Sequence, residues 1–90
     1  MSRNVLVTGA SRGIGRAIAV AFAERGERVA VHCSSRPREA RRTLELLSGE
    51  GHILVRADLG EPDAAADLVA RVVERMGGID VVVNNAAINT

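Results

Sequence analysis

The sequence of 90 residues contains no tyrosine and no lysine. All 12 of its basic residues are arginine, and Phe22 is its only aromatic residue. Tyrosine and lysine are common proton carriers, lysine forms Schiff bases with carbonyl substrates, and a P-loop requires a lysine after its glycines. A mechanism that depends on either residue type therefore cannot be completed within these residues, and a P-loop is excluded.

Cysteine and long apolar runs are also scarce. Cys33 is the single cysteine, so no internal disulfide can form, which fits a reducing compartment. No apolar run approaches the roughly 18 residues of a membrane-spanning helix. The three consecutive apolar residues after Asn4 are too few for the core of a signal peptide. We therefore expect a cytoplasmic protein without a membrane partner.

The charges nearly balance, with 12 basic against 11 acidic residues and a net charge of +1. Such a balance creates no strong field that would attract nucleic acid. The arginine-rich stretch of residues 36–42 contains no aromatic side chains, so we interpret it as a solvated helix face rather than a nucleic-acid site. Only Arg36 is kept as a candidate for binding a phosphate group.

What the sequence does contain is a regular alternation of two hydrophobic periods. Short apolar runs of the length of strands buried on both faces occupy residues 4–7, 28–31, 52–57 and 80–83. Three segments with helical spacing lie between these runs. The alternation predicts a parallel sheet with right-handed crossovers, a doubly wound α/β fold of the Rossmann type.

Glycine and proline mark the ends of the three predicted helices. The first helix ends at Gly26, the second opens at Pro37 and ends near Gly49, and the third runs from about Pro62 to Gly77. In the first helix, the helical spacing places five residues along one face: Ile14, Ile18, Ala21, Phe22 and Arg25.

The fourth apolar run, Val81-Val82-Val83, has no polar face. At an open edge such a strand would expose unpaired backbone groups. In the strand order 3-2-1-4-5-6 the fourth strand is interior. We therefore expect these residues to form the first four strands and three helices of a larger sheet, as a fragment of a longer domain.

The strongest local signal is the run of residues 8–15, which follows a predicted strand and opens a predicted helix. Its glycines, Gly9, Gly13 and Gly15, let the backbone turn tightly and approach a phosphate without intervening Cβ atoms. The helix N-terminus offers free N–H groups and the positive end of a dipole. This context predicts a phosphate-binding loop; the alternative is a turn that merely needs glycine.

Three motifs together resemble those of the short-chain dehydrogenases/reductases. Residues 8–15 resemble the TGxxxGxG motif of that family, Asp58-Leu59 resembles its acidic-aliphatic pair, and residues 84–87 resemble its NNAG motif. Each motif stands at the carboxyl end of a predicted strand. The resemblance covers the whole chain but only the cofactor-binding half of the family, and it is closest to the 3-oxoacyl-(acyl-carrier-protein) reductases.

The resemblance implies a cofactor site built from the ends of the strands. The residues expected around the phosphates and the adenosine ribose are Gly9, Ser11, Arg12, Gly13, Ile14 and Gly15. Asp58 would accept a hydrogen bond from the adenine amino group, and the Leu59 backbone would lie along the ring. Asn85, Ala86 and Ala87 would pass close to the ribose units, and Ala87 stands where the family has a glycine.

The end of the second strand bears on the choice between NAD and NADP. In NAD-specific domains a carboxylate there holds the ribose 2′-OH and would repel a 2′-phosphate. Here Cys33 is followed by Ser34, Ser35 and Arg36, and these hydroxyls suit a phosphate together with the guanidinium of Arg12 or Arg36. We expect NADP(H) rather than NAD(H), with Cys33 near the adenosine. The alternative is that Cys33 packs in the core and the serines cap the next helix.

The two histidines receive no role from the sequence. His32 and Cys33 are neighbours in a strand and point to opposite faces, so they make a poor metal pair. His52 stands at a strand start, where we expect it to be solvated. No metal site is predicted.

Enzymes of the family transfer a hydride between nicotinamide and a carbonyl or alcohol carbon, with a Tyr-x-x-x-Lys pair, a serine and an asparagine. Because tyrosine and lysine are missing, we assign no catalytic residue. The resemblance implies that residues 1–90 are the N-terminal part of one NAD(P)-binding domain in a homo-oligomeric oxidoreductase. Its expected substrate is a small molecule, with a 3-oxoacyl thioester as one candidate. The alternative is a stand-alone nucleotide-binding module or pseudo-enzyme.

Overall fold

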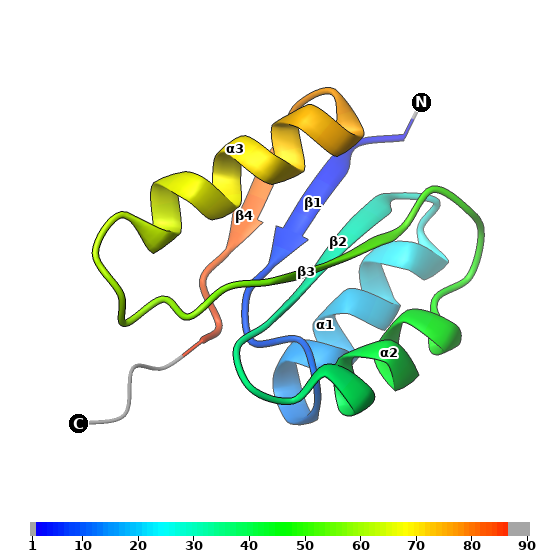
Figure 1. Cartoon of the computed structure of the whole chain (residues 1–90). Coiled ribbons are helices and arrows are strands. Elements are labelled where there is room, and N and C mark those ends of the chain that lie inside the picture. Colours follow the sequence, from blue (N-terminus) through cyan, green and yellow to red (C-terminus); the bar gives the residue numbers. More distant parts are fainter. Residues whose placement is uncertain (1, 87–90) are drawn as a thin grey trace.

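The structure is a computed structural model that describes residues 2–86, which form a four-stranded parallel sheet and three helices (Figure 1). The strands are β1 (Asn4–Val7), β2 (Arg28–Cys33), β3 (Ile53–Arg56) and β4 (Val81–Val83). The helices are α1 (Gly13–Glu24), α2 (Pro37–Leu46) and α3 (Ala64–Met76). The order β3-β2-β1-β4 and the parallel pairing confirm the predicted Rossmann-type α/β fold.

The helices cover both faces of the sheet, with α1 and α2 on one face and α3 on the other (Figure 1). Since side chains alternate along a strand, each face has its own core. The core under α1 and α2 consists of Val5, Val7, Ala10, Ala19, Ala23, Val29, Val31, Cys33, Ala40 and Leu47. The core under α3 consists of Leu6, Ala30, Val55, Ala57, Leu68 and Val72. Within residues 2–86, no helix has the length and apolar content that a bilayer span requires.

The face of α1 that packs on the sheet differs in part from the predicted one. Ile14 is 73% exposed and Ala21 is exposed, whereas Gly15, Ala19 and Ala23 are buried against the sheet. Two members of the predicted face, Ile18 and Phe22, do pack against the core, so the prediction was wrong for Ile14 and Ala21. Close approach of α1 to the strands admits small side chains, so packing distance selects the glycine–alanine face.

Strand β4 lies at one edge of the sheet among the described residues and pairs with β1 alone. Its pairing runs in register from Val5 opposite Val81 to Val7 opposite Val83. The side chain of Val82 is half exposed. Pairing with the central strand β1 places the loop after β4 next to the glycine loop after β1.

Candidate functional site

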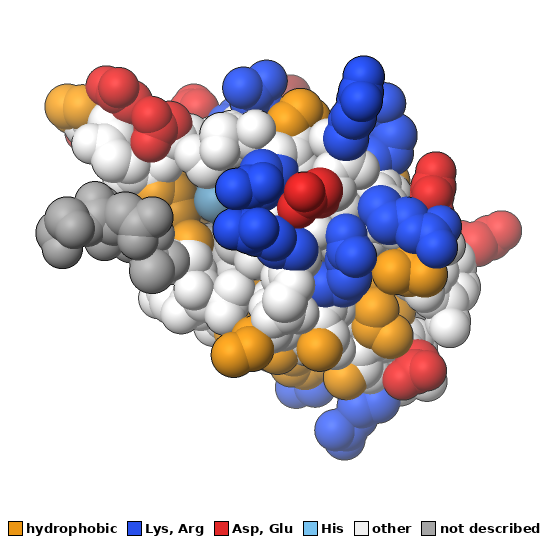
Figure 2. Space-filling view, turned by 90° about the horizontal axis from the view of Figure 1, so that it is seen from below, with side chains coloured by type: hydrophobic (Ala, Val, Ile, Leu, Met, Phe, Trp, Pro, Cys, Tyr) orange, Lys and Arg blue, Asp and Glu red, His pale blue; other side chains and the backbone are white. Residues whose placement is uncertain are grey.

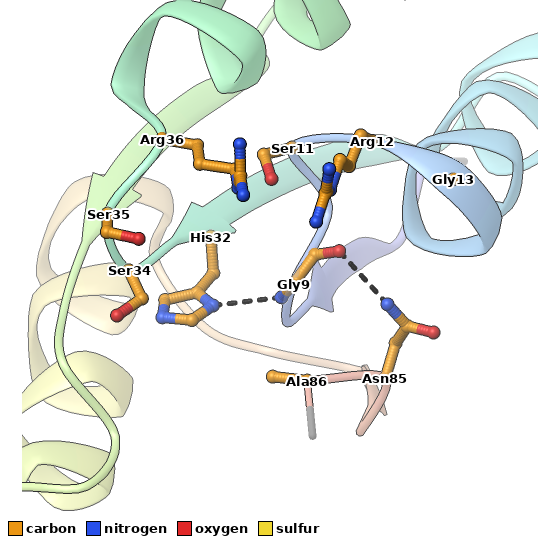
Figure 3. A pocket seen from close by; sticks show the side chains of 10 residues that line it. All are labelled: Gly9, Ser11, Arg12, Gly13, His32, Ser34, Ser35, Arg36, Asn85 and Ala86. Atoms are coloured by element: carbon orange, nitrogen blue, oxygen red, sulfur yellow. Dashed lines mark hydrogen bonds between the residues drawn. The ribbon is translucent and has the colours of Figure 1, made fainter. Parts of the chain in front are cut away.

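The loops that follow β1, β2 and β4 meet at one end of the sheet and surround an open cavity of about 310 Å³ (Figure 3). The residues that line it are Gly9, Ser11, Arg12, Gly13, His32, Ser34, Ser35, Arg36, Asn85 and Ala86. In parallel α/β sheets, ligands bind outside the carboxyl ends of the strands where crossovers diverge to opposite faces. Here the crossover that leaves β1 contains α1 on one face, and the crossover that arrives at the neighbouring strand β4 contains α3 on the other, so the cavity lies at such a point.

The glycine loop packs tightly against the loop after β4. Gly9 adopts a φ of 63°, and a Cβ at this position would come within 2.9 Å of the Ala86 Cα. The Asn85 side chain donates a hydrogen bond from Nδ2 to the Gly9 carbonyl at 3.0 Å. A Cβ on Gly15 would come within 2.6 Å of the same Nδ2. Glycine at positions 9 and 15 is therefore a packing requirement of the site.

Thr8 fixes the loop after β4 from the other side. Its Oγ1 accepts hydrogen bonds from the backbone N–H groups of Asn85 and Ala86, each at 3.0 Å. The Thr8 N–H donates to the Val83 carbonyl at 3.1 Å. Thr8 is buried, so these bonds are sheltered from water. Together with Asn85, this threonine sets the position of one wall of the cavity.

The first turn of α1 faces the cavity with its N-terminal end. Arg12 is its N-cap residue, has extended backbone with φ of −163°, and no side chain of residues 2–86 caps this end by a hydrogen bond. The N–H groups of an uncapped first turn and the positive end of the helix dipole favour an anion. This end of α1 can therefore bind a phosphate group.

His32 is a cavity residue that the sequence did not identify as functional. It is 1% exposed. The Gly9 N–H donates to its Nδ1 at 3.0 Å, and its Nε2 lies 2.8 Å from the Ala57 carbonyl oxygen. Burial lowers the pKa of His32, the Ala57 carbonyl opposes that shift, and the charge of Arg71 adds to it. A histidine at the end of an otherwise apolar buried strand was the available signal, because a buried polar group needs partners.

Two arginines give the cavity its positive charge, and three serines add hydroxyl groups. Arg12 and Arg36 both extend into it (Figure 3), and arginine side chains gather on this side of the molecule (Figure 2). Glu39 pairs with Arg36 over 3.5 Å, with both side chains nearly half exposed. No carboxylate lines the cavity among the described residues. Guanidinium and hydroxyl groups without a competing carboxylate suit a phosphate monoester.

Arg16 connects the glycine loop to α2. Its Nη2 donates to the Ser11 carbonyl at 2.7 Å and to the Glu39 carbonyl at 2.9 Å. Its Nε donates to the Thr43 hydroxyl at 2.8 Å, and that hydroxyl donates to the Ala10 carbonyl at 2.8 Å. These bonds hold the first turn of α2, and with it the arginine that precedes it, beside the glycine loop.

Five of the expected site residues do not line the cavity, namely Ile14, Gly15, Cys33, Asp58 and Leu59. Cys33 is 1% exposed and packs in the core under α1 and α2, and burial raises the pKa of its thiol. Asp58 is exposed and accepts the Gly60 N–H at 3.0 Å. Ala87 lies outside the described residues. His52, expected to be solvated, is partly buried and accepts the Val29 N–H at 3.0 Å.

Comparison with known proteins gives matches over nearly the whole chain. The family model for short chain dehydrogenases matches residues 3–90. Versicolorin reductase 1 from Aspergillus parasiticus is 45% identical over 85 residues, which cover 92% of this chain and 32% of the relative. The 3-oxoacyl-(acyl-carrier-protein) reductase FabG from Staphylococcus epidermidis is 39% identical over 90 residues, which cover 98% of this chain and 37% of the relative.

Solved structures agree with these matches. The promiscuous reductase LugOII, which catalyses keto-reduction at C1 during lugdunomycin biosynthesis, has a TM-score of 0.84 at 41% identity. The match covers 96% of this chain and 38% of that one. The chain thus spans between 32% and 38% of the length of these relatives. The resemblance inferred from the three motifs is confirmed, and the chain belongs to the short-chain dehydrogenase family.

Proposed function

We propose that this chain is the NADP(H)-binding portion of a single nucleotide-binding domain in a reductase. The reaction proposed for the whole protein is hydride transfer between nicotinamide and a carbonyl or alcohol substrate. The observation that carries the proposal is the cavity with two guanidinium groups, three hydroxyl groups and no carboxylate among its described lining residues. When bound, the cofactor would supply or accept the hydride.

The residues of this chain would bind and orient the dinucleotide. The uncapped end of α1 would hold the diphosphate. Arg12 and Arg36, with the hydroxyls of Ser34 and Ser35, would hold the 2′-phosphate. Asp58 is exposed at the end of β3, where its carboxylate is open to an adenine amino group. These assignments support NADP(H) over NAD(H), because a 2′-hydroxyl does not need two arginines.

The relatives support a carbonyl substrate without singling one out. One is named as a versicolorin reductase and another as a 3-oxoacyl-(acyl-carrier-protein) reductase. A third performs a keto-reduction. Since the name common to all three is reductase, we propose ketone reduction for the whole protein, with an acyl thioester among the candidate substrates.

The test of cofactor choice introduces a carboxylate into the cavity. Ser35→Asp should weaken the binding of NADPH by about tenfold to a hundredfold, because a carboxylate repels a 2′-phosphate. The affinity for NADH should stay the same or increase, because the carboxylate can bind a 2′-hydroxyl. Ser35→Asn is the matched control, because an asparagine side chain has the shape of aspartate without its charge. Dissociation constants for both nucleotides would be measured by titration calorimetry.

Equal effects of the two substitutions on NADPH would contradict the proposed position of the 2′-phosphate. Tighter wild-type binding of NADH than of NADPH would contradict NADP(H) as the cofactor. We choose Ser35 rather than Cys33, because Cys33 is buried in the core. A charge at Cys33 would destabilise the fold irrespective of any nucleotide.

A further inference from the structure

We propose that His32 is a positioning residue that holds the glycine loop in its cofactor-binding shape and releases it when the imidazole becomes protonated. The inference rests on the proposed dinucleotide function of the cavity. It concerns a side chain that belongs to none of the three family motifs. If it is correct, nucleotide affinity depends on the charge state of this histidine.

The two contacts of His32 define its tautomer. A backbone N–H can only donate, so Nδ1 must accept from Gly9 at 3.0 Å. A carbonyl oxygen can only accept, so Nε2 must carry the proton that it donates to Ala57 at 2.8 Å. Both contacts are satisfied by the neutral ring alone. A second proton on Nδ1 would face the Gly9 N–H and break that bond.

The position of the ring makes this bond relevant to the cavity. His32 lies at the end of β2 between the glycine loop and the end of β3, and Figure 3 shows its ring beside Gly9. Gly9 is also the residue whose carbonyl accepts from Asn85 and whose Cα position leaves no room for a side chain. Movement of Gly9 would therefore disturb both walls of the cavity.

The groups around the ring disfavour its protonated form. Arg12 from the glycine loop and Arg36 from the segment before α2 line the same cavity. Arg71 on α3 acts on the ring through its charge. Asp58, next to Ala57, is the carboxylate on the β3 side and is exposed to solvent. The loop after β4 contributes no charged side chain to the cavity among the described residues. Burial and the charge of Arg71 lower the pKa of His32, which favours the neutral ring at physiological pH.

Two substitutions separate the two contacts. In His32→Asn the amide oxygen replaces Nδ1 as the acceptor for Gly9 and cannot be protonated near neutral pH. In His32→Gln the longer amide reaches toward Ala57 and leaves the Gly9 N–H without an acceptor. His52→Asn is the matched control, since His52 makes the same pair of contacts at the opposite end of the sheet, to Val29 and Ser48.

The experiment measures NADPH dissociation constants of the purified intact protein and its variants at about pH 8 and about pH 5.5, on either side of the ordinary histidine pKa. The 2′-phosphate itself titrates near pH 6, so each variant is compared with the wild type at both values. On acidification we expect the wild type and His52→Asn to lose more affinity than His32→Asn, by severalfold and by no more than about tenfold, because burial already lowers the pKa of His32 below its ordinary value. His32→Gln should bind more weakly than His32→Asn at both pH values.

The outcomes distinguish the inference from the function on which it rests. If the wild type binds NADPH at neither pH, the proposed function fails and the inference fails with it. If it binds NADPH and His32→Asn follows the same pH profile as the wild type, the positioning role is overturned while the proposed function stands.

A second measurement needs no variant. Nitrogen NMR of the wild-type imidazole rings should identify the Nε2–H tautomer of His32 at neutral pH. The Gly9 amide resonance should shift on acidification with the same midpoint as that ring. A proton on Nδ1 at neutral pH would overturn the inference, and so would a Gly9 chemical shift that stays constant while the His32 ring titrates. Either result counts even if the variants fail to fold.

Discussion

Each end of the sheet has a histidine that bridges two chain segments with the same pair of contacts. At the carboxyl end, His32 accepts from the Gly9 N–H and contacts the Ala57 carbonyl. At the amino end, His52 accepts from the Val29 N–H and contacts the Ser48 carbonyl at 2.7 Å. The first is almost fully buried and lines a cavity, whereas the second is partly exposed.

The other polar contacts follow the same division. At the amino end, Asn4 donates from Nδ2 to the carbonyls of Met76 and Gly78, and Arg3 is paired with Glu27. These contacts join chain segments to one another directly. At the carboxyl end the glycine turn carries the chain away from the strand, and a hollow remains between the loops. Contacts at the amino end therefore stabilise the sheet, whereas contacts at the carboxyl end also position the loops around the candidate site.

The largest expected difference between the two ends concerns glycine. Gly15→Ala puts a methyl group against the Gly9 carbonyl and the Asn85 amide. We expect a loss of about 3 kcal/mol of unfolding free energy and loss of nucleotide binding, since neither neighbour can move away freely. Urea denaturation and NADPH titration would measure both effects.

The matched control is Gly77→Ala at the end of α3. Gly77 has a φ of 90°, and a Cβ there would meet nothing within 4 Å. The substitution should cost about 1–2 kcal/mol through backbone strain alone and leave nucleotide affinity unchanged. Equal losses for the two variants would contradict the claim that close packing makes Gly15 necessary.

The second prediction compares two buried polar side chains. Thr8→Val removes the acceptor of two backbone N–H groups at the carboxyl end, and Asn4→Ala removes the donor to two carbonyls at the amino end. Each should lower the free energy of unfolding by about 2 kcal/mol, because part-buried backbone groups remain unsatisfied. Of the two substitutions, only Thr8→Val should also weaken the binding of NADPH. Weaker binding in Asn4→Ala, measured at a temperature where both variants are folded, would break the division between the two ends.

The smallest expected effect is a difference in acid sensitivity. Bonds from Arg3 hold the pKa of Glu27 below its ordinary value of 4.5, so the stability from this carboxylate is present above about pH 4.5 and lost as pH falls further. Burial lowers the pKa of His32, so its contribution is present above about pH 6.5 and is lost on acidification below that value. On acidification, the stability contributed at the amino end should therefore be lost at a lower pH than the stability contributed at the carboxyl end.

Urea midpoints between about pH 3 and pH 8 test this order. Glu27→Gln should flatten the profile below about pH 4.5, whereas His32→Asn should flatten the profile between the folded-state pKa of His32 and about pH 6.5. If Glu27→Gln instead altered the pH dependence of the urea midpoint above pH 5, the pH ranges assigned to the two ends of the sheet would be wrong.

Much of the fold could be predicted because buried parallel strands are apolar on both faces. The run of residues 4–7 predicted β1 at both boundaries. The second strand continued to Cys33, two residues beyond the predicted end, because its polar His32 finds partners in the loops. Helix α2 ended at Leu46, before the predicted Gly49. Periodicity locates elements well and their ends less well, since caps and tertiary contacts decide where an element stops.

The candidate site was predictable where it depends on the backbone and less so where it depends on side chains. The glycine loop was recognisable, since Gly9 requires a positive φ and Gly15 requires close approach. The role of His32 depends on partners 23 and 25 residues away. Cys33, its neighbour, faces the opposite core.

The sequence by itself determined the alternation of strands and helices, the family and the arginine-rich character of the loops, because these properties reside in local pattern and composition. Only the tertiary structure decided which side chains meet. Parallel pairing brings the ends of β1, β2 and β4 to one edge, and the alternation of side chains then sends His32 toward the cavity and Cys33 into the core. Packing distance, which no local pattern encodes, selected the small-residue face of α1 for burial.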